Sequence, residues 1–202
     1  MRVLVIGGTG LLGTAVTEAL GPSGRGHVVL VASRSSDLRV DLTDESSIVD
    51  MYRNAGRIDA VAVAAGSVPM RPISQLTHSD FLRGITNKLL GQIDVVLQGI
   101  PLLPDGGSFT LVSGITAHDP IQGGSALSMI NSAIDGFVRG AAVDLPRGLR
   151  INSVSGNVFR EASALDRHSF PGYLAVPVAD VAQAFVKSID GSQTGQTYRV
   201  GY

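Results

Sequence analysis

The residues best suited to bind an anion lie near the amino terminus, in the run Gly7-Gly8-Thr9-Gly10-Leu11-Leu12-Gly13. An apolar segment typical of a buried strand precedes this run, and an amphipathic segment typical of a helix follows it. Such glycine spacing permits a tight turn, close approach of the backbone to a pyrophosphate, and close packing of helix on strand. The free N–H groups and dipole of the helix favour negative charge. The residues predicted to hold a dinucleotide pyrophosphate are therefore Gly7, Thr9, Gly10, Leu11, Leu12 and Gly13; a generic tight turn is the alternative.

The nature of the nucleotide follows from what surrounds this loop. A nucleoside triphosphate site requires a lysine directly after the last glycine, and here Gly13 is followed by Thr14. A methyltransferase or an NAD enzyme usually carries an acidic residue about 20 residues beyond the loop to bind the ribose hydroxyls. This chain has Ser33, Arg34 and Ser35 there. Because a guanidinium binds phosphate strongly, Arg34 favours the 2′-phosphate of NADP over NAD. A solvated loop arginine is the alternative.

The elements that position these residues alternate along the chain. Short apolar runs predict strands buried on both faces at residues 3–6, 28–32, 60–65, 109–112, 151–154 and 198–200, with a short strand at 38–40. Apolar spacing of three and four predicts helices at residues 11–20, 46–54, 81–99, 125–144 and 178–189. The alternation predicts an α/β fold: one Rossmann-type domain, residues 1–202, with a doubly wound parallel sheet covered by helices on both faces.

Ligands of such folds bind beyond the carboxyl ends of the strands. The residues there are nearly all small or polar, at 7–13, 33–35, 64–67, 113–114 and 155–157. Asp41 and Leu42 follow the short third strand, and we expect them beside the adenine. Residues 160–176 are irregular, and we expect a mobile lid over the substrate there.

Composition limits the class of partner. The formal net charge is -1 with a pI of about 6.4, so nothing favours nucleic acid or an anionic membrane, and we expect a local site for a small molecule. The chain has no cysteine, which removes disulfides and thiolate nucleophiles and fits a cytoplasmic enzyme. Its four histidines are scattered without the spacing of metal ligands, so no metal is predicted.

Several motifs resemble the short-chain dehydrogenase/reductase family, over essentially the whole chain. The segment Ala64-Ala65-Gly66 resembles the Asn-Asn-Ala-Gly element after the family's fourth strand, and Leu111-Val112-Ser113-Gly114 resembles the strand that ends in its catalytic serine. Residues 133–137 and 145–155 resemble its following helix and sixth strand. The resemblance implies an NADP-dependent oxidoreductase that moves a hydride to or from a small carbonyl or alcohol-type substrate, with Ala64, Ala65 and Gly66 beside the cofactor.

The chain departs from this family at the residues that move protons. In the family a tyrosine exchanges a proton with the substrate oxygen, and a lysine four residues later lowers its pKa and holds the nicotinamide ribose. The corresponding positions are Leu127 and Asn131, so both residues are replaced. Gly10 also stands one place earlier than in most members. Two hypotheses follow: an oxidoreductase with an atypical active site, and a catalytically silent dinucleotide-binding sensor or partner subunit.

Three residues are candidates for the atypical active site. Ser113 matches the serine that orients a substrate carbonyl; a turn serine is the alternative. Lys88, one of two lysines against fourteen arginines, stands where the family has a water-holding asparagine. We predict that its ammonium binds a ribose hydroxyl or polarises a substrate oxygen, with a solvated surface charge as the alternative. Asn131 is a candidate to fix a ribose hydroxyl or a water, or serves packing only. Tyr173, in the expected lid, is a further candidate acid.

The resemblance also implies assembly into homodimers or homotetramers through paired helices. The helices around Lys88 and at residues 125–144 carry apolar residues on more than one predicted face, among them Ile85, Leu89, Val96, Ile130, Ile134 and Val138. We expect these faces to meet in the assembly.

Overall fold

The computed structural model describes the backbone of residues 1–202 and every side chain except those of Leu165 and Asp166. Its centre is a seven-stranded parallel sheet in the order β3-β2-β1-β4-β5-β6-β7. The strands are β1 (Arg2–Ile6), β2 (Val28–Ser33), β3 (Leu38–Arg39), β4 (Ala60–Val63), β5 (Ser108–Val112), β6 (Arg150–Gly156) and β7 (Thr197–Val200). The sheet confirms the predicted Rossmann-type α/β fold.

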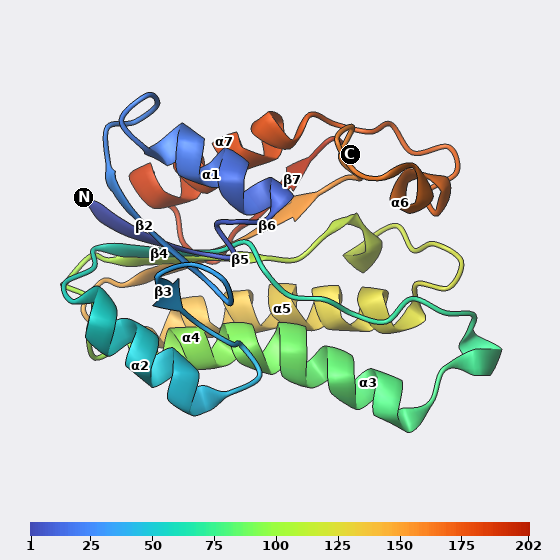
Figure 1. The fold of residues 1–202 in the computed structure, drawn as a ribbon, viewed down its shortest axis with the longest axis horizontal. Coiled ribbons are helices and arrows are strands. Elements are labelled where there is room, and N and C mark those ends of the chain that lie inside the picture. Colours follow the sequence, from blue (N-terminus) through green and yellow to red (C-terminus); the bar gives the residue numbers. More distant parts are fainter.

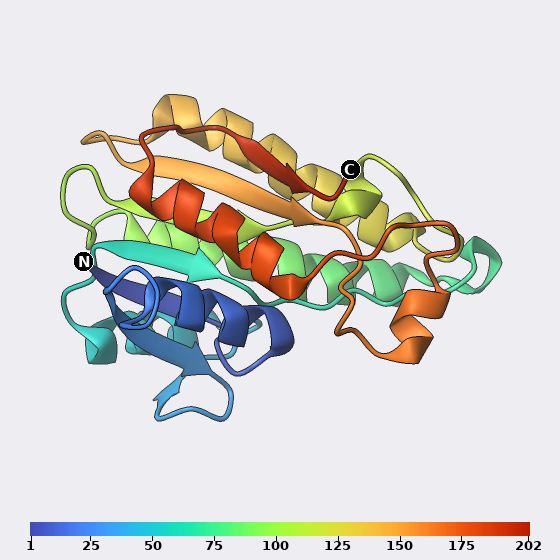
Figure 2. The same cartoon turned by 90° about the horizontal axis from the view of Figure 1, so that it is seen from above.

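Helices cover both faces of the sheet. The α-helices of the chain are α1 (Leu11–Leu20), α2 (Glu45–Ala55), α3 (His78–Gly84), α4 (Gly91–Gly99), α5 (Ser125–Asp144), α6 (Ala164–His168) and α7 (Val178–Asp190). Figure 1 shows α1 and α7 above the sheet and α2, α4 and α5 below it, and Figure 2 shows α1 and α7 side by side across the strands. Among the described residues, no helix is both long and apolar enough to cross a membrane.

The four residues Val3 to Ile6 of β1 are all apolar because each face of the sheet has its own core. Along β1, Val3 and Val5 pack into the cluster formed with α1 and α7, whereas Leu4 and Ile6 pack into the cluster formed with α2, α4 and α5. All four side chains are at most 1% exposed. Period-two alternation between two buried faces therefore gives a continuous apolar run rather than an alternating one.

The helix predicted at residues 81–99 is longer and less regular than expected. It begins at His78 because Thr77 and Asp80 form a capping box, in which each side chain accepts a hydrogen bond from the other's backbone N–H. Between α3 and α4, residues Ile85–Leu90 form a π-helical segment, and the Gly91 N–H bonds the carbonyl of Thr86, five residues back. Such segments occur frequently at functional sites. This one carries Lys88.

Other boundaries differ by smaller amounts. β3 ends at Arg39 and β4 ends at Val63, so residues 64 and 65 belong to the loop that follows β4. The segment 160–176, expected to be irregular, contains the short helix α6 and a single parallel bridge between Phe159 and Val176. This bridge attaches the segment to the chain just after β6.

The apolar residues expected to form an assembly surface lie mostly in the chain's own core. Ile130, Ile134, Val138 and Val96 are at most 1% exposed, and Ile85 and Leu89 pack against the same cluster. The expectation that they form a second face is therefore wrong, because α4 and α5 use them to cover the sheet. The large apolar side chains exposed on the π-helical segment, α4 and α5 are Leu90, Leu97, Met129 and Val143.

Candidate functional site

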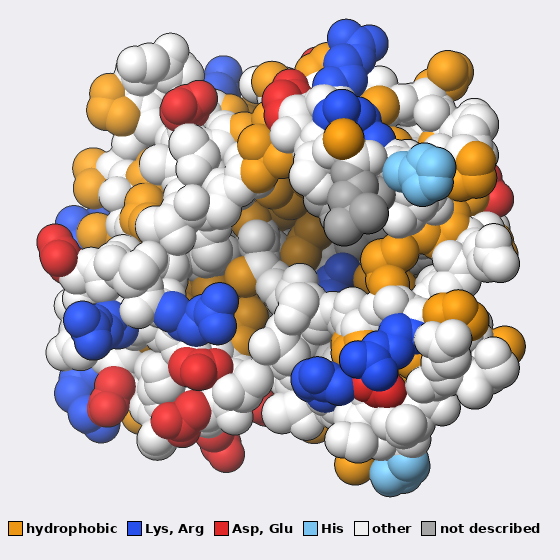
Figure 3. All heavy atoms as spheres, turned by 45° about the vertical axis from the view of Figure 1, so that its right-hand side comes forward, with side chains coloured by type: hydrophobic (Ala, Val, Ile, Leu, Met, Phe, Trp, Pro, Cys, Tyr) orange, Lys and Arg blue, Asp and Glu red, His pale blue; other side chains and the backbone are white. Residues whose placement is uncertain are grey.

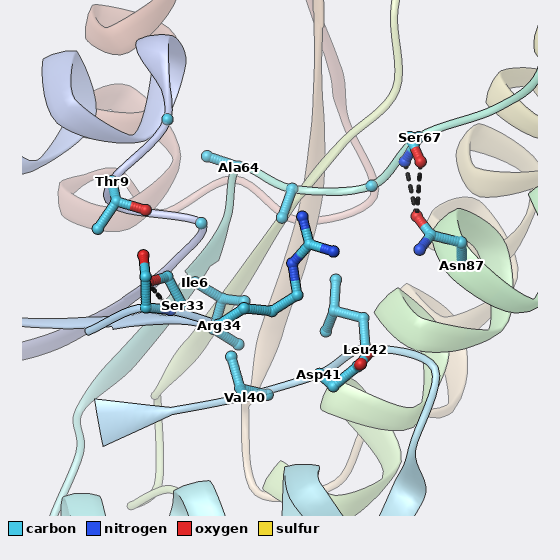
Figure 4. A pocket seen from close by; sticks show the side chains of 15 residues that line it. Ile6, Thr9, Ser33, Arg34, Val40, Asp41, Leu42, Ala64, Ser67 and Asn87 are labelled. Atoms are coloured by element: carbon cyan, nitrogen blue, oxygen red, sulfur yellow. Dashed lines mark hydrogen bonds between the residues drawn. The ribbon is translucent and has the colours of Figure 1, made fainter. Parts of the chain in front are cut away.

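A pocket of about 390 Å³ lies beyond the carboxyl ends of β1, β2 and β4. The strand order reverses between β1 and β4, so the pocket occupies the position where ligands bind in open α/β sheets. Its lining residues come from five segments and are Ile6, Gly7, Thr9, Gly10, Ser33, Arg34, Ser35, Val40, Asp41, Leu42, Ala64, Ala65, Gly66, Ser67 and Asn87. Figure 4 shows these side chains around the opening.

The glycine loop forms one wall of this pocket. Gly7 has a φ of 81°, a conformation that favours glycine, and its N–H donates to the carbonyl of Ala32 at 2.8 Å. Gly13 lies behind the loop, where a Cβ atom would stand only 2.0 Å from the Gly7 carbonyl oxygen. Leu12 is buried in the core and Leu11 is exposed. Of the predicted loop residues, Gly7, Thr9 and Gly10 therefore face the pocket, and Leu11, Leu12 and Gly13 do not line it.

The turn after β2 directs Arg34 into the pocket. The Ser33 hydroxyl accepts the backbone N–H groups of Ser35 and Ser36 at 3.1 and 2.9 Å, which fixes the turn. Figure 4 shows the Arg34 guanidinium extended into the opening, between Leu42 and the segment at Ala64. Within the described part of the chain, Arg34 forms no ion pair within 4.0 Å. Its charge is thus available to an anionic ligand.

Asp41 does not neutralise this arginine. Its carboxylate accepts the backbone N–H and the hydroxyl of Thr43 at 2.9 and 2.7 Å. These two hydrogen bonds, with a smaller contribution from Arg34, hold the pKa of Asp41 below its ordinary value. The aspartate is therefore an ionised group whose orientation is fixed by Thr43.

The loop after β4 connects the pocket to the π-helical segment. The Asn87 side-chain oxygen accepts the Ser67 backbone N–H at 2.7 Å, as Figure 4 shows. Gly66 has a φ of 123°, and a Cβ atom there would stand 2.6 Å from Cγ of Lys88. The stem of Lys88 thus lies directly against a glycine that no other residue type replaces without a clash. Sequence reasoning missed Asn87 as a pocket residue, although it is the neighbour of Lys88.

Lys88 is buried, with 6% of the residue exposed. Its ammonium donates to the side-chain oxygen of Asn131 at 2.7 Å and to the backbone carbonyl of Ser113 at 3.2 Å. Burial lowers the pKa of Lys88 to about 8, and the nearby charge of Asp135 opposes this shift. Lys88 does not line the nucleotide pocket itself. The structure brings the three predicted catalytic residues together, with the ammonium in the middle.

Ser113 and Asn131 complete this buried group. The amide nitrogen of Asn131 donates to the hydroxyl of Thr116 at 2.8 Å, which orients its oxygen towards the lysine. Ser113 is 5% exposed, and its hydroxyl has no hydrogen-bond partner among the described residues. A buried polar atom without a partner is rare in native proteins. The Ser113 hydroxyl is therefore a candidate hydrogen-bond partner for a bound ligand.

Two supporting residues were not found from the sequence. Gln92, one turn after Lys88 and fully buried, bonds both the N–H and the carbonyl of Val112 and so fixes the end of β5. Asp135, one turn after Asn131, is 2% exposed, accepts the Ser153 hydroxyl at 2.7 Å and lies 3.4 Å from the His118 ring. Gln92 and Asp135 stand four residues after the site residues Lys88 and Asn131, which places each on the same helix face as its site residue. This spacing was the sequence signal that could have identified them.

Tyr173, the further candidate acid, is hydrogen-bonded to the backbone. Its hydroxyl donates to the backbone carbonyl of Asp119 at 3.0 Å, and it contacts Phe170 edge to face. Burial, followed by the contact with Asp119, raises the pKa of Tyr173 above its ordinary value, which makes it a weaker acid. Its hydroxyl therefore attaches the segment after α6 to the loop before α5. Among the described residues, no group of three or more side chains could hold a metal ion.

Comparisons with known proteins cover most of the chain. A family model described as Enoyl-(Acyl carrier protein) reductase matches residues 14–183. Hydroxynaphthalene reductase arp2 of Aspergillus fumigatus is 29% identical over 69% of this chain and 50% of that protein, so this chain spans about half of that relative. The short chain dehydrogenase/reductase AacuN of Aspergillus aculeatus is 28% identical over 84% of this chain and 74% of its own length.

Solved structures are similar over nearly the whole chain. The protein lin1944 from Listeria innocua is 45% identical, with 99% of both chains covered and a TM-score of 0.95. A small-chain dehydrogenase in complex with NADPH is 25% identical, with 99% of this chain and 96% of that chain covered and a TM-score of 0.87.

Proposed function

The chain belongs to the short-chain dehydrogenase/reductase family, and from this premise we propose that it binds NADP(H) and transfers a hydride to or from a small carbonyl or alcohol-type substrate. The observation that carries the proposal is the buried ammonium of Lys88, bonded to Asn131 and to the carbonyl of Ser113 beside an unpartnered serine hydroxyl. An inert dinucleotide carrier has no need of a buried cation at this position, because burying it costs free energy.

The pocket fits a nicotinamide dinucleotide phosphate. Gly7 and Gly10 let the backbone approach a pyrophosphate, and Arg34 presents an unpaired guanidinium for the 2′-phosphate. The solved relative with bound NADPH has the same fold over 99% of this chain. When bound, the cofactor supplies or accepts the hydride. What remains for the chain is to orient the substrate and to move a proton.

Lys88 is the group that moves this proton. Its ammonium has three N–H donors, of which Asn131 and the Ser113 carbonyl take two, so the third is available to a ribose hydroxyl or a substrate oxygen. A pKa of about 8 lies close to neutral pH, where an acid is most effective. As the carbonyl carbon gains the hydride, its oxygen takes a proton from Nζ. In the reverse direction the neutral amine accepts the proton from the alcohol.

Asn131 and Ser113 position the other partners of this step. Asn131 holds the lysine in place through its side-chain oxygen, and Thr116 fixes the orientation of the amide. The Ser113 hydroxyl donates to the substrate oxygen. This arrangement moves the amine from α5, where the family carries its lysine, to the facing π-helical segment. Leu127, at the position of the family tyrosine, contributes no proton.

The test separates the enzyme from the silent dinucleotide-binding sensor or partner subunit. NADPH binding is measured first by its fluorescence, with NADH as the control. A panel of aldehydes and ketones is then incubated with NADPH deuterated at C4 of the nicotinamide, and the products are analysed for deuterium. We expect tight NADPH binding and deuterium at the former carbonyl carbon. Tight binding without label in any product contradicts the enzyme proposal and favours the sensor.

We further infer that the chain acts as a homo-oligomer. α4 and α5 lie on one face of the sheet, and Leu97 and Met129 on these helices are 53% and 41% exposed. Apolar side chains exposed on neighbouring helices favour burial against a second copy. Sedimentation velocity of the purified chain tests this inference, and a monomer at micromolar concentration contradicts it.

A further inference from the structure

A second cleft, of about 460 Å³, lies on the face of the molecule that carries the irregular segments. Its lining residues are Met70, Arg71, Pro72, Gln122, Gly123, His168, Ser169 and Pro171. Figure 3 shows one face of the molecule with a central hollow, around which hydrophobic side chains gather. The walls come from the segment after β4, the loop before α5, and the end of α6 with the segment that follows it.

This cleft lies on the same two segments as the candidate active site. The chain after β4 passes from Ala64 and Ser67, which line the nucleotide pocket, to Arg71, which lines the second cleft. The loop containing Gly123 leads directly into α5, which carries Asn131 two turns later. The segments that line the second cleft are thus continuous in the chain with those that carry the candidate active site.

Arg71 gives the cleft its chemical character. Its backbone is fixed by a hydrogen bond from its N–H to the Gly123 carbonyl at 3.0 Å. The Arg71 side chain is 53% exposed and forms a long ion pair with Asp80, at 4.0 Å between nitrogen and oxygen, which is beyond hydrogen-bond distance. The Asp80 carboxylate is already engaged by the backbone N–H and hydroxyl of Thr77 and by the guanidinium of Arg83. The donors of Arg71 thus remain available on the cleft side.

The remaining lining residues add no negative charge. His168 is the other ionisable side chain in the lining, and its charged form is positive. Met70, Pro72 and Pro171 supply apolar surface, and Gln122 supplies an amide. A cleft with one half-exposed guanidinium that makes no hydrogen bond among the described residues, set among apolar side chains, fits a hydrocarbon chain that ends in an anion.

We propose that this cleft binds a carboxylate of the substrate through Arg71, so that the substrates are keto acids and the corresponding hydroxy acids. This inference rests on the proposed oxidoreductase function. Arg71 is then a specificity residue that acts on binding, and it takes no part in the transfer of the proton or the hydride. The carboxylate end lies in the second cleft while the ketone lies between Ser113 and Lys88.

The test compares aliphatic keto acids of increasing chain length with their methyl esters, which keep the skeleton and remove the charge. Binding to the NADP-loaded protein is measured by calorimetry, and turnover is measured separately as NADPH oxidation. We expect the best-fitting acid to bind about tenfold or more tightly than its ester, the effect of one charge-assisted pair. Arg71→Gln removes this preference and leaves NADP affinity unchanged, and Arg71→Lys restores part of it.

Arg53→Gln is the matched control. Arg53 is also exposed and also pairs with a carboxylate, that of Asp50, but it does not line the cleft, so its loss leaves the preference for the acid intact. Equal binding of acids and esters overturns the proposal, as does a preference that survives Arg71→Gln, or NADP binding without binding of any keto acid. Failure of the protein to bind NADP refutes the proposed function instead, and the two failures are thereby distinguishable.

Discussion

Replacement of Lys88 by methionine removes the ammonium and keeps a long apolar stem against Gly66. The residue is 6% exposed, and its Nζ makes hydrogen bonds of 2.7 and 3.2 Å. Hydrogen bonds to charged groups contribute about 1.5–3 kcal/mol each. If one such bond forms with the substrate oxygen in the transition state, its loss lowers kcat/KM by roughly 10- to 150-fold. Loss of proton transfer lowers it further.

The pH dependence isolates the role of this ammonium. Since the pKa of Lys88 in the folded chain is about 8, reduction that requires its proton weakens as pH rises through about 8. The ordinary value in the unfolded chain is 10.5, so between these two values the unfolded state binds more protons. The free energy of unfolding therefore rises with pH in this window. Lys88→Met abolishes both effects.

The assay uses the fact that the chain has only two lysines. Carbon-13 labelling at Cε gives two lysine signals, and Lys187→Met assigns them. Lys187 lies on α7, with its ammonium 4.9 Å from the centre of the Tyr198 ring, and serves as the control variant. We expect Lys187→Met to leave turnover unchanged. A titration in which Lys88 keeps its ordinary pKa, or unaltered turnover in Lys88→Met, refutes the reasoning.

Two further predictions concern the residues around this lysine. Asp135→Asn removes the charge that opposes the effect of burial, so we expect the pKa of Lys88 to fall below about 8. The loss of activity at alkaline pH then moves to lower pH. A lysine titration that is unchanged in this variant contradicts the electrostatic interaction between Asp135 and Lys88. Gly66→Ala places a Cβ atom 2.6 Å from Cγ of Lys88, and we expect a loss of about 1–3 kcal/mol of stability together with weaker NADPH binding. Gly106→Ala is the control, because Gly106 also has a positive φ but no atom lies within 4 Å of the added Cβ. An equal loss of stability in both variants would assign the loss to backbone strain and contradict a clash with Lys88.

The fold could be predicted from the sequence because its signals are local. Apolar runs that form strands buried on both faces, and apolar residues at helical spacing, are each recognised from a few neighbouring residues. The bounds predicted for α1 and α5 are those of the structure. The glycine loop was readable for the same reason. The π-helical segment was not, because one additional residue in a turn leaves the apolar spacing on either side nearly unchanged.

The candidate site was predictable only in part, because its contacts join distant segments. Lys88 and Asn131 lie 43 residues apart, and only the folded chain brings Nζ to the amide oxygen. The need for Gly66 depends on the path of the Lys88 side chain, which no local pattern contains. The second cleft likewise joins residues near positions 71, 122 and 168. Sequence patterns identified the groups but not their partners.

Calorimetric titration of the chain with NADPH and with NADH tests the central claim most directly. The account predicts that NADPH binds at least about tenfold more tightly, because the Arg34 guanidinium forms a charge-assisted bond with the additional phosphate. Arg34→Ala removes this preference without abolishing the binding of NADH. Absence of binding by both cofactors, or a preference for NADH in the unmodified chain, contradicts the account.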